Sequence, residues 1–229
     1  MSTYASQLEE EQRAVTRAYN RLDALRAETK QRLDAVRAAG AHGSPTQRTE
    51  RDSFATMYED RLIQLRGVED RLVFGRLDNT RNERLYIGRI GLTDEQHTPM
   101  LIDWRAEAAR PFYEATPSHH GDIVMRRHIT LHFRDVVALE DEVLDIHSKS
   151  VDEASTSGTL TGEGALLASL SSRRTGKMTD IVATIQGEQD KIIRSPIDRA
   201  VVVQGGPGTG KTAVALHRAA YLLYTHRRT

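Results

Sequence analysis

Several features that would narrow the function of this 229-residue chain are absent. It contains no cysteine, which excludes a disulfide framework and any cysteine-ligated zinc site. No apolar run approaches the roughly 20 residues that a helix needs to span a bilayer. The first residues, MSTYASQLEEEQR, are too acidic and polar for a signal peptide. We therefore expect a cytoplasmic protein without a membrane partner.

An excess of charge is also absent, because 32 lysines and arginines are balanced by 32 aspartates and glutamates. A protein that holds nucleic acid mainly by charge needs a clustered surplus of basic side chains, since binding is driven by the release of counterions from the phosphates. The balance therefore argues against a chain that binds nucleic acid by bulk charge.

Residues 1–75 carry the apolar repeat of an antiparallel coiled coil. From Leu8 to Val36 one seam recurs every seven residues, and four residues fill a second seam: Ala18, Tyr19, Leu25 and Leu33. After residues 40–43 the pattern restarts behind Ser44-Pro-Thr-Gln47, a capping-box sequence. It continues through Phe54, Tyr58, Leu62, Leu65, Val68 and Leu72. A connection this short predicts two helices that pair as an antiparallel hairpin.

Residues 76–150 change to the period of two that is typical of strands, and glycines and prolines separate the segments. This pattern predicts a small β-rich domain. We predict its strands at residues 85–90, at 100–104, within 122–137, and in a short piece at 112–113.

The rest of the chain divides into two further parts. Residues 151–178 begin with a small, polar stretch without periodicity, which predicts a flexible linker followed by a short helix. Residues 179–229 carry the pattern of the start of an α/β domain with a phosphate-binding loop. The fold class that we expect is α+β, in a multidomain fragment.

The strongest motif follows the apolar run at residues 200–203, which predicts a buried parallel strand. GGPGTGKT comes next and leads into an amphipathic helical pattern. In this strand–loop–helix context, glycines let successive backbone N–H groups point at phosphate oxygens. We therefore predict that nine consecutive residues bind a nucleotide: Gly205, Gly206, Pro207, Gly208, Thr209, Gly210, Lys211, Thr212 and Ala213.

Three side chains receive specific roles at this predicted site. Lys211 can reach the β- and γ-phosphates of ATP, and the Thr212 hydroxyl can join the shell of Mg²⁺, so these two residues are the catalytic candidates. Gln189 lies about twenty residues upstream of the lysine. Its amide can donate and accept at the adenine edge, which would select ATP over GTP; the alternative is a polar helix residue without such a role.

The stretch from Gln186 to Tyr224 resembles the opening of the first RecA-like domain of UvrD-like superfamily 1 helicases, with Gln189 at their Q-motif position. Three segments, LHRAAYLLY at 216–224, LYIGRIGL at 85–92 and IDWRAEAARPFY at 102–113, look more specifically like the HelD group. The resemblance implies a helicase-like ATPase of the bacterial cytoplasm that binds the RNA polymerase core. It implies that the hairpin enters the polymerase secondary channel, and that ATP drives clearance of DNA or RNA and recycling of stalled enzyme.

Two departures limit what the resemblance implies. The chain ends at Thr229, before any Walker B acid, arginine finger or second RecA-like domain, so we expect the N-terminal part of a longer protein, inactive alone. Residues 38–47, the expected hairpin tip, contain no aspartate or glutamate. A tip that steers the catalytic Mg²⁺ of a polymerase needs carboxylates, so this hairpin is expected to anchor or wedge.

Other functions stay open at this point. The chain could belong to a DNA helicase or translocase of DNA repair, or be a polymerase-binding module with a vestigial nucleotide site. A metal site at His128 and His132 is less favoured than ordinary polar histidines. Trp104 is expected in the core of a domain rather than as a base-stacking platform. A cluster of three basic residues beside the linker is expected to be solvated: Arg173, Arg174 and Lys177.

Overall fold

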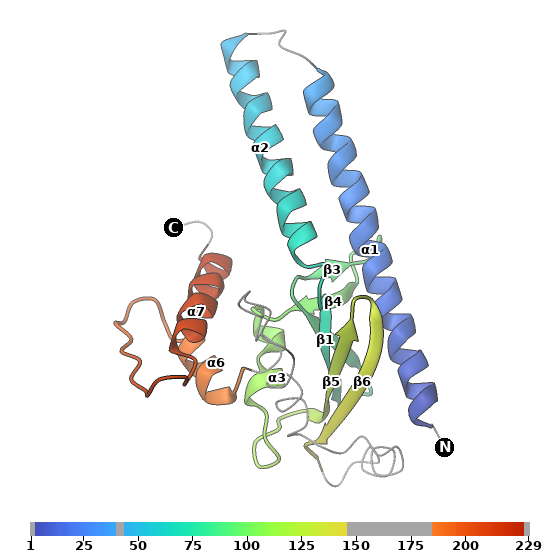
Figure 1. Ribbon diagram of the computed structural model, residues 1–229, viewed down its shortest axis with the longest axis vertical. Helices are drawn as coiled ribbons and strands as arrows, with labels where there is room; N and C mark the ends of the chain where they lie inside the picture. Colours follow the sequence, from blue (N-terminus) through green and yellow to red (C-terminus); the bar gives the residue numbers. More distant parts are fainter. Residues whose placement is uncertain (1–2, 40–43, 146–184, 227–229) are drawn as a thin grey trace.

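A computed structural model of the chain describes residues 3–39, 44–145 and 185–226. It has an α+β architecture in which two long helices rise from a mixed sheet (Figure 1). The helices are α1 (Tyr4–Ala38), α2 (Pro45–Gly67), α3 (Pro111–Glu114), α6 (Gly187–Ile193) and α7 (Lys211–Thr225), with a 3₁₀ turn at Glu107–Ala109. The strands are β1 (Val73–Asn79), β2 (Arg84–Gly88), β3 (Leu92–Thr93), β4 (Pro99–Asp103), β5 (Ile123–His132) and β6 (Asp135–Val143).

The predicted helical hairpin is confirmed. The Thr3 hydroxyl accepts a hydrogen bond from the Ser6 N–H at the start of α1, and Ser44 and Gln47 form the predicted capping box at the start of α2. The second helix ends at Gly67, earlier than the repeat predicted, because the chain turns there toward β1 and Leu72 is buried beside the sheet. The hairpin arms are therefore unequal, with 35 residues in α1 and 23 in α2.

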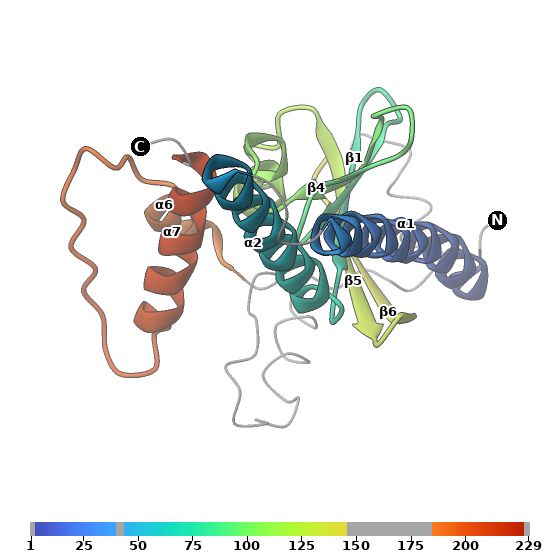
Figure 2. The ribbon, with the colours of Figure 1, turned by 90° about the horizontal axis from the view of Figure 1, so that it is seen from above.

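The first half of α1 packs on the sheet rather than on α2, as Figures 1 and 2 together show. Val15, Tyr19 and Leu22 share a core with residues of the strands, including Ile129 and Leu139. One apolar seam of α1 therefore packs on strands in the first half of the helix and on α2 in the second half. The Tyr19 hydroxyl donates a hydrogen bond of 2.7 Å to the Glu69 carbonyl and so joins this half of α1 to the turn after α2.

The sheet has six strands in the order β3-β4-β2-β1-β5-β6, and β2 and β4 run parallel while the other neighbours are antiparallel. The predicted strands at 85–90 and 100–104 correspond to β2 and β4. The predicted stretch 122–137 contains β5 and only the first residues of β6, and the chain turns between them at Phe133, which has a positive φ of 55°. The predicted boundary at residue 75 falls inside β1.

The short strand predicted at residues 112–113 is wrong, because these residues form α3. Pro111 occupies the first turn, where its fixed φ favours a helix and its missing N–H costs nothing. Phe112 and Tyr113 are buried between the sheet and α6. Gly75 of β1 allows the close packing of the Phe112 ring, since a Cβ at this position would lie 2.2 Å from it.

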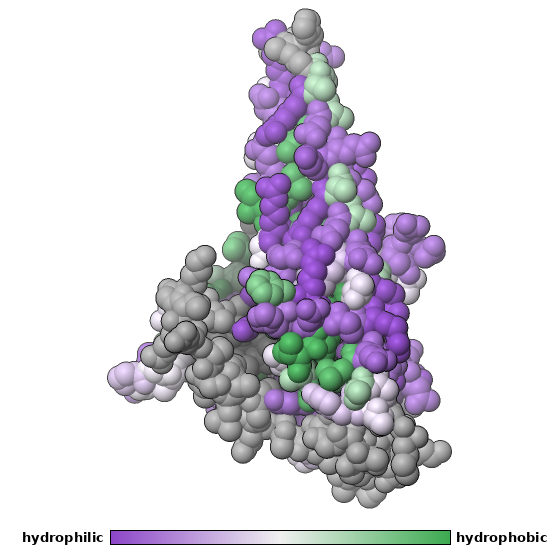
Figure 3. Space-filling model, turned by 45° about the vertical axis from the view of Figure 1, so that its right-hand side comes forward, coloured by the Kyte–Doolittle hydropathy of each residue, from purple (hydrophilic) through white to green (hydrophobic). Residues whose placement is uncertain are grey.

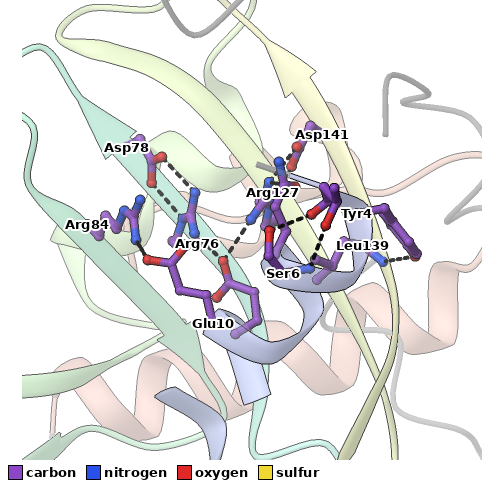
Figure 4. A network of polar contacts seen from close by, with 12 residues as sticks. Tyr4, Ser6, Glu10, Arg76, Asp78, Arg84, Arg127, Leu139 and Asp141 are labelled. Carbon is purple, nitrogen blue, oxygen red and sulfur yellow. Dashed lines mark hydrogen bonds and ion pairs between the residues drawn. The ribbon is translucent and has the colours of Figure 1, made fainter. Parts of the chain in front are cut away.

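A buried ionic network, which we call the base network, joins α1 to the sheet (Figure 4). Its members are Gln7, Glu11, Arg76, Asp78, Arg127 and Asp141. Glu11 is 0% exposed and pairs with both Arg76 and Arg127, the second pair at 2.8 Å. Arg127 is also bound by the Asp141 carboxylate at 2.6 Å. The network therefore fixes the helix on β1, β5 and β6 by charge as well as by apolar packing.

The outer surface of the hairpin is mostly hydrophilic on the face that Figure 3 shows. This agrees with the charged positions between the apolar seams of the sequence. Three large apolar side chains of α2 are nevertheless exposed: Phe54, Met57 and Ile63. None of the helices in the described ranges is both long and apolar enough to cross a membrane.

Candidate nucleotide-binding site

The glycine-rich loop leads directly into α7, and its backbone explains two of its glycines. Gly208 and Gly210 have φ angles of 80° and 81°, in the left-handed region that side chains with a Cβ rarely adopt. Gly210 is the N-cap of α7, and no side chain caps this end of the helix. The first backbone N–H groups of α7 are therefore not capped by a side chain, and they lie at the positive end of the helix dipole.

Lys211, the predicted phosphate ligand, folds back over the loop. Its ammonium donates hydrogen bonds to the carbonyls of Gly205 at 2.7 Å and Gly206 at 2.5 Å. The Thr209 hydroxyl donates to the same Gly206 carbonyl at 2.9 Å. The other predicted loop residues lie along this turn, where Pro207 and Thr212 are exposed and Ala213 is half-buried. The side chain of Lys211 thus links the end of the loop to its first two glycines.

Gln189 lies against the end of the loop. Its side-chain Nε2 is 3.4 Å from the point where a Cβ on Gly210 would be, and its Oε1 accepts a hydrogen bond of 3.3 Å from the Gln186 N–H. The Gln186 and Gln189 side chains form a capping box at the start of α6. The structure therefore brings Gln189 and Gly210 together, although they are far apart in the sequence.

Two arginines hold α6 and α7, the helices on either side of the loop, and sequence reasoning gave them no role. Arg194, at the end of α6, donates to the carbonyls of Trp104 at 2.7 Å and Arg105 at 3.2 Å. Arg218 of α7 donates to the Ser195 carbonyl at 2.6 Å and to the Ser195 hydroxyl at 2.9 Å. The only sequence signal for these contacts is the segment 102–113, whose carbonyls Arg194 meets.

The segment that contains the loop shares a core with the β-rich part of the chain. Ile185, Ile193 and Val214 pack in the same cluster as Trp104 and Phe112. Trp104 is 5% exposed and meets the His217 ring edge-on at 5.5 Å, and Arg105 pairs with Asp103 at 2.6 Å. The expectation that Trp104 is a core residue and not a stacking platform is therefore confirmed.

The strand predicted at residues 200–203 does not form. Residues 201–203 have no strand pairing, and Val202 is 91% exposed. A parallel strand needs a neighbouring strand for its hydrogen bonds, and the six-stranded sheet of the described ranges does not extend to this segment. The apolar run is therefore exposed before the loop in this structure.

The histidines of the described ranges give no sign of a metal centre. Within the described parts of the chain, no three histidine, aspartate or glutamate side chains converge to hold a metal ion. His128 meets the Phe112 ring edge-on at 5.0 Å. Burial, aided by the nearby Arg126 charge, lowers the pKa of His128 to about 4. His128 is thus an uncharged, packed side chain at neutral pH.

Several predictions lie outside the described residues. They concern the linker at 151–178, the basic residues Arg173, Arg174 and Lys177, and residues 40–43 of the expected hairpin tip. The proposed division at residues 150 and 179 is likewise untested and stays a prediction.

The model of one protein family matches residues 8–156 and is described as the N-terminal domain of DNA helicase IV HelD. The chain belongs to this family. The HelD match covers α1 from Leu8 onward, all of α2 and the whole sheet, and it ends before Gln189 and Lys211. No curated protein matches the chain. The HelD relation and the glycine-rich loop are therefore two separate observations. The two parts of the chain meet in the shared core around Trp104 and where Arg194 contacts the segment 102–113.

Proposed function

We propose that the chain is the N-terminal part of an ATP-dependent, helicase-like factor of the HelD type, in which the glycine-rich loop starts a RecA-like domain and binds ATP. The observation that carries the proposal is the proximity of the Gln189 amide to Gly210. It joins the candidate adenine ligand to the candidate phosphate loop at the start of one helix. The HelD family match supports the helicase-like class independently.

The residues of the loop fit a nucleoside triphosphate. The ammonium of Lys211 now binds two carbonyl oxygens, and phosphate oxygens would replace them as stronger, charged acceptors. The N–H groups at the start of α7 would bind further phosphate oxygens. Thr212, exposed beside the lysine, would contribute its hydroxyl to Mg²⁺. The metal, when bound, neutralises the charge that develops on the phosphates during hydrolysis.

Gln189 would select adenine by its side-chain amide. Adenine presents a donor at N6 and an acceptor at N7, which match the oxygen and the nitrogen of an amide. Guanine carries an acceptor at both positions, so the amide oxygen would face a carbonyl oxygen. The nitrogen of Gln189 already points to the loop, while its oxygen would leave the Gln186 N–H to reach the base.

Equilibrium binding of ATP and GTP to the 229-residue chain with Mg²⁺ tests this site. We expect Lys211→Ala to abolish binding of both nucleotides, and Gln189→Ala to weaken ATP more than GTP by about 1–3 kcal/mol. Lys191→Ala is the matched control, because Lys191 is an exposed lysine of α6 that has no contact with the loop in this structure. Tight ATP binding by the Lys211 variant would refute the site.

RNA polymerase is the partner that we propose for the hairpin, in the bacterial cytoplasm, with the helices lying in the secondary channel. A stiff pair of helices fixed on a sheet loses little conformational entropy when it enters a preformed channel. The complete factor would then use ATP to clear DNA or RNA and recycle stalled polymerase. The alternative partner is DNA, in a UvrD-like helicase or translocase of repair.

A photocrosslinker at Ala38, the exposed last residue of α1, separates these partners. In cells that carry the complete protein, we expect adducts with the largest polymerase subunits. The matched position is Ser6, exposed at the other end of the same helix, where no polymerase adduct is expected. Adducts with DNA alone at Ala38 would contradict the polymerase assignment and favour the repair helicase.

A further inference from the structure

Arg194 is a buried arginine that attaches the end of α6 to the turn after β4. Its side chain is 5% exposed, and its Nε lies 2.9 Å from the carboxylate of Asp190, which is 0% exposed. Its two Nη atoms donate to a row of backbone carbonyls after β4, which belong to Trp104, Arg105 and Ala106. A guanidinium that leaves water must satisfy its N–H groups, and this turn supplies the acceptors.

The contacts of Arg194 reach three elements at once. Asp190 belongs to α6, the carbonyls belong to the turn after β4, and the ring of Tyr221 in α7 lies 5.3 Å from the guanidinium. The planar guanidinium of an arginine has five N–H donors and can make these contacts together, whereas the single ammonium of a lysine cannot. The Arg218 contacts, in contrast, join the end of α6 to α7 without reaching the β-rich part.

The direction of Gln189 depends on how α6 is held, because a helix of seven residues is not stable by itself. At its first residue, Gly187 approaches the Tyr113 carbonyl so closely that a Cβ would lie 2.9 Å from it. At its other end, Arg194 binds the turn after β4. Gln189 lies between these two attachments, next to Asp190, and its amide nitrogen faces Gly210.

We propose that Arg194 is a positioning residue for nucleotide recognition, which fixes α6 on the turn after β4 and so aims the Gln189 amide at the adenine edge. This inference rests on the proposed ATP site. It assigns the preference for ATP to a contact between the HelD-type sheet and the loop segment, and not to Gln189 alone.

The test is the ratio of GTP to ATP dissociation constants in the 229-residue chain. Arg194→Lys keeps the positive charge and removes the planar guanidinium. We expect it to lower the ratio by at least about fivefold, in the range of a lost bidentate base contact. Gln189→Ala should lower the ratio similarly. The double variant should show the ratio of Gln189→Ala alone, because an arginine that acts through Gln189 has no effect without it. Arg199→Lys, at an exposed arginine of the same segment, is the matched control.

A purely structural arginine would weaken both nucleotides equally, so an unchanged ratio in Arg194→Lys would overturn the inference while the loss of binding in Lys211→Ala still supports the ATP site. Additive ratios in the double variant would also overturn it. Equal affinity of the unaltered chain for ATP and GTP would refute both proposals. If Arg194→Lys does not fold, Asp190→Asn provides the same ratio test, because it removes the charge that orients the guanidinium.

Discussion

Glu11 is the centre of the base network, and its replacement by glutamine tests whether buried charge holds the hairpin on the sheet. The carboxylate is 0% exposed and neutralises part of the charge of Arg76 and Arg127, which are themselves buried. Glutamine has nearly the same shape and keeps one acceptor oxygen. The substitution therefore removes a buried negative charge and leaves two buried guanidinium groups with fewer partners.

The expected loss of stability follows from this burial. Removal of one partner from a buried ion pair typically costs 3–5 kcal/mol, because the remaining charge stays desolvated. Since Asp78 and Asp141 still bind the two arginines, we expect the lower end, about 3 kcal/mol. For a chain of this size each kcal/mol shifts the unfolding midpoint by about 2–4 °C, which gives a decrease of roughly 6–12 °C.

Glu10→Gln is the matched control, one residue earlier on the same helix. Glu10 pairs with Arg84, and their side chains are 42% and 45% exposed. Exposed pairs contribute less than about 1 kcal/mol and are screened by salt. Thermal unfolding followed by circular dichroism, at low and at high salt, compares the two variants. If Glu11→Gln unfolds at the same temperature as Glu10→Gln, the base network does not stabilise the hairpin as we argue.

Two further predictions concern the loop and the half-buried His128. Gly208→Ala should weaken ATP binding about five- to thirtyfold, because an alanine at φ 80° is strained by roughly 1–2 kcal/mol. Gly67→Ala, at a glycine outside the loop with open space for a Cβ, is the control in the same binding assay. His128 is uncharged when folded, so the free energy of unfolding should fall by about 2 kcal/mol as the pH decreases from 7 to 5, where unfolded histidine takes up a proton. Denaturant titrations at both pH values should show a smaller decrease in His128→Gln, and an equal decrease in the two proteins would contradict the burial effect.

The helical hairpin could be predicted because its signals are local. A seven-residue repeat, a capping box and a short connection all lie within the segment that folds. The partner of the repeat is not local, and the sequence does not distinguish Val15, which packs on strands, from Leu33, which lies higher in the hairpin. The same limit explains why the position of β1 and the parallel pairing of β2 with β4 were not predicted.

Part of the candidate site could likewise be predicted from the sequence, and part of it could not. The loop glycines and Lys211 follow from a motif whose spacing reflects backbone geometry, and Gly208 and Gly210 have the left-handed conformation that only this kind of residue favours. Arg194 could not be predicted, because its acceptors are backbone carbonyls about ninety residues away, which leave no mark in the sequence. The exposed run at 201–203 was mispredicted because apolar character indicates burial but not the neighbour that provides it.

The continuity of α1 has a mechanical consequence. The helix contains neither proline nor glycine, the usual causes of kinks, and its first half is clamped to the sheet by the base network. From Leu22, in the core with the sheet, to Ala38 the helix extends by about 24 Å. A rotation of the sheet by about 5° would therefore sweep the end of α1 through about 2 Å. The opposite face of that sheet carries α3, on which Gly187 of α6 rests, so a tilt of α1 would move the sheet on which the loop segment also packs.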